Sequence, residues 1–144
     1  MKTFEDFVYE KAETVGQILE SDFFLAQSIL ESEYEDGMIS TVGSFFKKVW
    51  NANTRSSVFI IVEEDIKQQY LVDSVSDDEQ ALLHCVPADD PHFEGMHIGE
   101  IIRALKFYGK DDPIYVTTPL GDNYAIQEVN VEDRTINIFV TKAV

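Results

Sequence analysis

Histidines and carboxylates gather near residue 95, where together they could hold a divalent metal ion. His92 and His97 lie close to four acidic residues, Asp89, Asp90, Glu94 and Glu100. Four residues separate the two histidines, one of them a glycine, and this spacing matches no common zinc motif. We therefore expect a solvated connector, with no metal ion and no cofactor. His97 is better explained as a helix cap, with Glu100 three residues further on.

His84 is the other residue whose type suits proton transfer. It lies in the segment ALLHCV, on the same face as Leu82 and Val86. A partly buried histidine can serve as a general base or as a pH switch. No motif places a serine or cysteine beside it, so a hydrogen-bonded structural role is favoured. The alternative is a small enzyme whose site lies between the two halves of the chain and uses His84 or His92 with nearby acids.

Other catalytic signatures are missing from the sequence. The neighbouring carboxylates Glu63 and Glu64 would point to opposite faces of a strand, as would Asp77 and Asp78, so neither pair makes an acid–base couple. Glycine-rich phosphate loops, nucleophile elbows and dinucleotide fingerprints do not occur. Cys85 is the only cysteine, which excludes an intramolecular disulfide and favours a core thiol. Nothing here is positive evidence for an enzyme.

Charge is the strongest chemical signal. The chain has 27 acidic and 11 basic side chains, a formal net charge of −16. Ten acids fall within residues 1–36, and eleven fall within residues 63–100, where Lys67 is the only base. Such a field repels nucleic acids and anionic membranes and attracts basic proteins. We expect a basic protein partner and no direct binding to DNA, RNA or membranes, although excess carboxylates also serve solubility.

The predicted partner-binding residues are carboxylates of the second acidic segment, joined by one aromatic residue. Trp50 aligns with Lys106 in the second half of the chain, so the fold does not require an apolar side chain there. It either packs against the N-terminal helices or anchors a partner, since tryptophan is enriched at binding hot spots. The predicted set is Glu63, Glu64, Asp65, Asp73, Asp77, Asp78, Glu79, Asp89, Asp90, Glu94 and Trp50.

These residues lie within a pattern that occurs twice. Residues 40–86 and residues 96–140 each read as one helix followed by three strands, with Gly43 and Gly99 at equivalent points near the helix starts. The alignment pairs Leu82 with Ile136 and His84 with Ile138. Apolar spacing carries the repeat, because few residues are identical between the two copies.

The elements predict an α+β fold in one domain of residues 1–144. Residues 1–36 form an acidic helical cap, and residues 40–86 and 96–140 form a tandem duplicated helix-strand-strand-strand unit joined by a connector at 87–95. The expected strands are 58–63, 70–75 and 81–86, then 114–118, 124–129 and 135–140. We expect these strands to build one or two antiparallel sheets with helices outside. Strand order and oligomeric state stay open.

The segment IGEIIRALKFYGKDDPIYVTTPLGDNYAIQEV resembles a module of small acidic uncharacterised proteins of Gram-positive phages and mobile elements. The likeness covers about a third of the chain well, and its motif is structural. Such elements often encode acidic inhibitors of host defence, including anti-restriction and anti-CRISPR proteins. The resemblance implies an inhibitor and no catalytic residues.

The leading hypothesis is a non-enzymatic, acidic interaction protein that occupies a basic, nucleic-acid-binding surface of another protein. An immunity protein against a basic toxin fits the same charge, and a structural assembly component is a third possibility. The N-terminal sequence MKTFEDFVYEK has acids where a signal peptide has an apolar run, so we expect a cytoplasmic protein.

Overall fold

The computed structural model describes residues 11–33, 39–63, 68–77, 80–89, 95–119 and 121–142. Its helices are α2 (Val15–Glu20), α3 (Phe23–Glu31), α4 (Val42–Lys48) and α5 (Ile98–Leu105). Its strands are β1 (Ser57–Val62), β2 (Gln69–Asp77), β3 (Ala81–Pro87), β4 (Ile114–Thr117), β5 (Asn123–Glu132) and β6 (Thr135–Lys142). Residues 1–10 and 34–36 of the predicted helical cap lie outside the described ranges.

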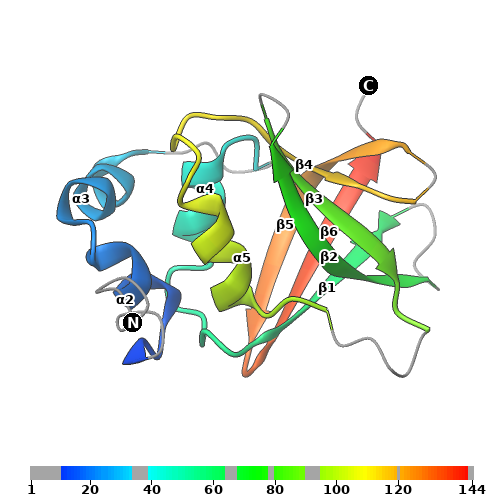
Figure 1. The fold of residues 1–144 in the computed structure, drawn as a ribbon, viewed down its shortest axis with the longest axis horizontal. Helices are drawn as coiled ribbons and strands as arrows, with labels where there is room; N and C mark the ends of the chain where they lie inside the picture. Colours follow the sequence, from blue (N-terminus) through cyan, green and yellow to red (C-terminus); the bar gives the residue numbers. More distant parts are fainter. Residues whose placement is uncertain are drawn as a thin grey trace, which may run out of the picture.

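The strands form a closed barrel in the order β1-β2-β3-β4-β5-β6 (Figure 1). Within each unit the neighbouring strands are antiparallel, whereas β3 pairs with β4, and β6 with β1, in parallel. The predicted α+β fold, with one or two antiparallel sheets, was therefore wrong: the strands form one closed, mixed barrel. Apolar alternation shows which face of a strand is buried, but it does not show that the first strand pairs with the last. Closing the sheet leaves no exposed edge strand.

The barrel interior is filled by alternate residues of each strand. β1 and β6 both alternate half-buried and buried positions, with Val58, Ile60, Ile136 and Ile138 almost fully buried. This alternation is the pattern of a sheet with one face toward the core. The core of the protein is therefore the inside of the barrel together with the helices that cover one of its ends.

Those helices are α4 and α5, and α2 and α3 lie outside them, farther from the barrel (Figure 1). α4 buries Phe45 and Phe46 completely, and α5 does the same with Ile101 and Ile102. No helix in the described ranges has the length and apolar character needed to cross a lipid bilayer.

The two units are joined at their helix starts, because the first turn of each helix is hydrogen-bonded to the segment before the first strand of the other unit. Gly43, the second residue of α4, donates its backbone N–H to the carbonyl of Lys110 at 2.7 Å. Gly99, the second residue of α5, donates to the carbonyl of Thr54 at 2.9 Å. The helix starts are thus equivalent in the two units, and their hydrogen bonds cross between units.

The predicted alignment of the third strands is wrong by one residue. Val58 pairs with Ile136 and Ile114 pairs with Ala81, so Ala81, and not Leu82, is equivalent to Ile136. The β5–β6 hairpin is one residue longer than the β2–β3 hairpin, and a shift of one residue exchanges the two faces of a strand. His84 consequently lies on the outer face of the barrel, while Ala81, Leu83 and Cys85 lie in the core cluster.

Candidate functional site

The two ends of the barrel differ, and the difference follows from strand direction. β1, β3, β4 and β6 run the same way. Their N-terminal ends lie at the helical end of the barrel, where α4 precedes β1 and α5 precedes β4, and their C-terminal ends lie at the other. We call this second end the loop end and define it by the described residues Glu63, Ala88, Asp89 and Asp122. In Figure 1 it lies on the right.

Acidic residues from three different connections lie at the loop end. Glu63 directly follows β1, Asp89 follows β3, and Asp122 precedes β5. The backbone N–H of Ala88 donates to the carbonyl of Gln69 at 2.9 Å, which ties the exit of β3 to the start of β2. The topology therefore places Glu63 and Asp89, which are far apart in sequence, at the same end of the barrel.

The Glu63 carboxylate is held in place, although it is exposed. The side-chain amide of Gln127, oriented with its nitrogen toward Glu63, donates to both carboxylate oxygens at 2.9 and 3.1 Å. Such bonds to an ionised acceptor are stronger than neutral ones and fix its direction. The loop end thus presents at least one positioned anionic group.

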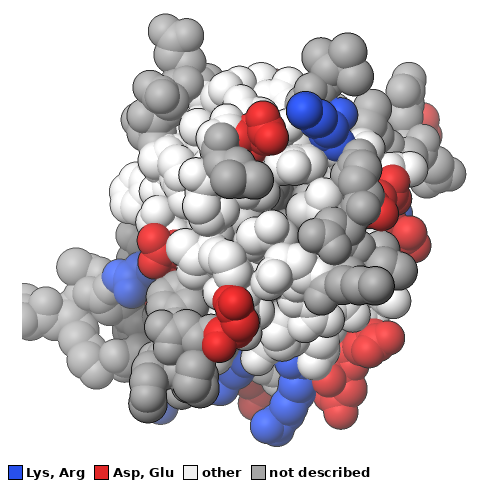
Figure 2. Space-filling view, turned by 90° about the vertical axis from the view of Figure 1, so that its right-hand side faces the viewer, with Lys and Arg blue, Asp and Glu red and all other residues white. Residues whose placement is uncertain are grey.

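Figure 2 shows carboxylates scattered among uncharged residues over this end, with Lys and Arg side chains at its upper right, left and lower edges. Among the residues drawn in colour, Asp and Glu side chains are separated by uncharged residues and do not form one continuous strip. Protein interfaces commonly combine a core poor in charge with a polar rim. The described part of this face has that arrangement.

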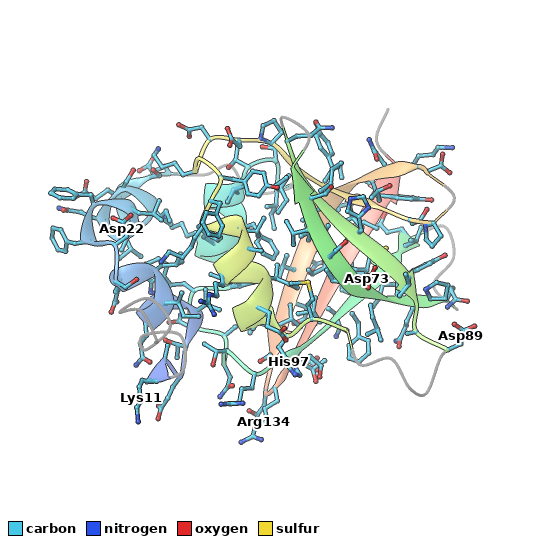
Figure 3. All side chains as sticks on the ribbon, viewed as in Figure 1. Lys11, Asp22, Asp73, Asp89, His97 and Arg134 are labelled. Carbon is cyan, nitrogen blue, oxygen red and sulfur yellow. The ribbon has the colours of Figure 1, made fainter. Side chains whose placement is uncertain are left out.

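The remaining predicted acids divide into three groups. Glu64, Asp65, Asp78, Glu79, Asp90 and Glu94 lie outside the described residues. Asp77 ends β2 at the helical end of the barrel, roughly 25 Å along the strand from the loop end. Asp73 is exposed at a bulge within β2, while Asp89 lies at the far loop end (Figure 3). The topology thus does not bring Glu63, Asp73 and Asp77 to one place.

Trp50 lies with the helices, away from the loop end. It is half-buried against the core, and its carbonyl accepts the backbone N–H of Gly16 at 2.8 Å. A Cβ atom added to Gly16 would come within 2.8 Å of the indole Cε2 atom. The structure therefore shows Trp50 packed against α2, and Gly16 permits that close approach.

One polar pair was missed by the sequence reasoning. The Ser76 hydroxyl is hydrogen-bonded to Nε2 of His84, and the Tyr108 hydroxyl donates to the Ser76 carbonyl at 2.5 Å. The signal was the eight-residue separation across the β2–β3 hairpin, which places both side chains on one face. Both residues belong to the first unit, and they border the second, because His84 pairs with Thr117 of β4 and Tyr108 follows α5.

A serine next to a histidine is the minimal nucleophile and base, but acyl transfer also needs a group that orients the imidazole. In the ranges that the structure covers, no carboxylate is hydrogen-bonded to the other ring nitrogen of His84. The Ser76–His84 pair is explained by mutual hydrogen bonding of two half-buried side chains.

Cys85 is confirmed as a core thiol. It is 3% exposed, and its Sγ atom donates to the carbonyl of Thr117 at 3.3 Å. Burial raises the pKa of this thiol to about 12, so it stays protonated at neutral pH.

The structure places His97 at the N-terminal cap of α5, where its backbone N–H donates to the Glu100 carboxylate at 3.2 Å. The described residues contain no group of three or more His, Cys, Asp or Glu side chains that could hold a metal ion. His92 lies outside the described ranges.

Comparisons of the chain with protein-family models, with characterised proteins and with solved structures found no match.

Proposed function

We propose that this protein is a non-enzymatic, acidic binding protein whose loop end occupies a basic, nucleic-acid-binding surface of a partner protein. The observation that carries the proposal is that described acidic residues from three separate connections lie at one end of the barrel. These residues are Glu63, Asp89 and Asp122.

Electrostatics supports a basic partner. A net charge of −16 speeds encounters with positively charged proteins and opposes binding to phosphate backbones. The resemblance of the second unit to small phage proteins favours the same kind of partner, one that itself binds DNA or RNA. An inhibitor of this type gains affinity by neutralising the cationic groups that otherwise contact phosphates.

The test is affinity capture from host lysate treated with nuclease, followed by competition with DNA or RNA. We expect a basic protein to be recovered, to be displaced by nucleic acid, and to bind more weakly as salt rises. The triple variant E63Q/D89N/D122N should bind this protein roughly tenfold more weakly, if each peripheral charge contributes about 0.5 kcal/mol.

The matched control is E128Q/E132Q/D133N, which removes the same formal charge elsewhere. These three residues are exposed, and they lie along β5 and in its turn to β6, which is at the helical end. Equal weakening by both triple variants would show that only total charge matters and would contradict a site at the loop end. Binding insensitive to salt and to nucleic acid would contradict the proposed partner class.

A further inference from the structure

Helix α3 exposes large apolar side chains at the opposite end of the molecule from the loop end. Phe24 is 83% exposed, Phe23 is 67% exposed and Leu30 is 51% exposed. The two phenylalanine rings contact each other edge to face, with centroids 5.9 Å apart. Neighbouring large apolar groups that remain in water commonly mark an interaction site.

These side chains border a groove with acidic residues on its rim. The groove has a volume of about 510 Å³ and is lined by Glu20, Phe23, Ala26, Gln27, Leu30 and Glu31. Phe23, Ala26 and Leu30 follow each other at helical spacing, so the apolar stripe is roughly 10 Å long. Among the described residues, its lining contains two carboxylates and no basic side chain.

The helices around the groove are fixed to the rest of the protein. The Lys47 ammonium donates to the Ser32 carbonyl at 2.6 Å, next to the end of α3. The Lys106 ammonium donates to the Ser21 hydroxyl at 3.2 Å, between α2 and α3. These bonds join the α2–α3 hairpin to α4 and α5, so the groove is a preformed surface.

Charge decides which occupant fits. Residues 11–33 contain five acids, Glu13, Glu20, Asp22, Glu31 and Glu33, against one base, Lys11. A second copy of the chain would place these carboxylates against themselves, which opposes self-association. A helix with an apolar stripe flanked by lysine or arginine would bury the phenylalanines and pair with the rim.

We propose that the α3 groove binds a basic amphipathic helix of a partner protein, with Phe23 and Leu30 as anchors and Glu20 and Glu31 as charge partners. This is the helix-in-groove mode of recognition. The site is separate from the loop end and does not depend on the function proposed for it.

The probe is a synthetic 14-residue helical peptide of leucine and lysine with leucines on one face, about four turns long. Two control peptides share its length, one with the same residues in an order without a stripe and one with glutamate in place of lysine. Binding is measured by fluorescence anisotropy, and the site is mapped from amide chemical shifts. We expect only the striped basic peptide to bind, with shifts concentrated on α2 and α3.

The F23A/L30A variant should bind at least about tenfold more weakly, because truncated anchors carry most of the affinity. The E20Q/E31Q variant should bind several-fold more weakly and respond less to salt. Phe107→Ala is the matched control, since Phe107 is 85% exposed but lies outside this groove, and it should bind normally. The loop-end variant E63Q/D89N/D122N should also bind the peptide normally.

Three results would overturn the inference. The control peptide with the same residues but no stripe could bind as tightly as the striped one, or Phe107→Ala could weaken binding as much as F23A/L30A. Light scattering could show a wild-type dimer that F23A/L30A abolishes, in which case the occupant is a second copy. Phe23, Leu30 and Glu31 lie on α3, and Glu20 ends α2. Thermal melting at the wild-type temperature confirms that the variants are folded.

Discussion

The close contact between Gly16 and Trp50 predicts that Gly16→Ala changes stability in opposite directions with and without the Trp50 side chain. A Cβ atom on Gly16 would come within 2.8 and 2.9 Å of the Cε2 and Cδ1 atoms of Trp50, closer than real Cβ atoms approach. The helix cannot move away freely, because the backbone N–H groups of Val15 and Gly16 donate to the carbonyls of Ala52 and Trp50, at 3.0 and 2.8 Å. Gly16→Ala should therefore destabilise the wild-type protein by about 1–3 kcal/mol, as overpacking does.

The same substitution should be harmless once the indole is removed. In a Trp50→Ala background the added methyl group meets empty space, and alanine is preferred over glycine within a helix by roughly 0.5 kcal/mol. The sign of the effect should reverse, and the coupling energy between the two positions should be on the order of 2 kcal/mol.

The assay is urea denaturation followed by far-UV circular dichroism, because Trp50 is the only tryptophan and fluorescence is lost in its variants. Gly109→Ala is the control, since its Cβ would make only ordinary contacts, at 3.5 Å from Asp112. If Gly16→Ala costs the same with and without the indole, the packing of α2 against the end of α4 has been described wrongly.

Three further predictions test the barrel. Ile138→Ala should cost about 2–5 kcal/mol in urea denaturation, whereas Val131→Ala, at a position 38% exposed, should be almost neutral. Cys85→Val should remove a loss of stability that the wild type shows as pH rises from about 9 toward 12. The thiol ionises first in the unfolded chain, so each pH unit in that window costs up to about 1.4 kcal/mol, visible as a difference in melting between the two proteins. Separate fragments 1–90 and 91–144 should fold only when mixed, as a 1:1 complex seen by circular dichroism and gel filtration, because Gly43 and Gly99 bond across the units.

Local structure was predictable wherever a short pattern carries its own physical reason. The repeated helix starts at Gly43 and Gly99 follow from capping and apolar spacing. The hydroxyl of Thr14 accepts the backbone N–H of Gln17 at 3.3 Å, as expected from its place before α2. These features depend on residues a few positions apart, so the sequence alone contains the information.

Closure and register were not predictable, because they depend on residues far apart. The parallel pairing of β1 with β6 joins Val58 to Ile136, and no local pattern records such a partner. The two hairpins differ in length by one residue, so His84 lies on the outer face and not on the predicted inner one. For the same reason its contact with Ser76 was not predicted. The same dependence on topology explains why acids at 63 and 89 lie at one end of the barrel, whereas acids at 73 and 77 lie elsewhere.

The near-twofold repeat also separates what the fold requires from what it does not. Asp73 and Gln127 occupy the bulges of β2 and β5, which are equivalent positions, so the bulge does not require a carboxylate. Glu63 directly follows β1, and its counterpart after β4 is Pro119. A shared backbone that accepts glutamine and proline at these two points does not itself require Asp73 or Glu63. The scaffold itself gives no reason for a carboxylate at position 63, whereas the proposed binding at the loop end does.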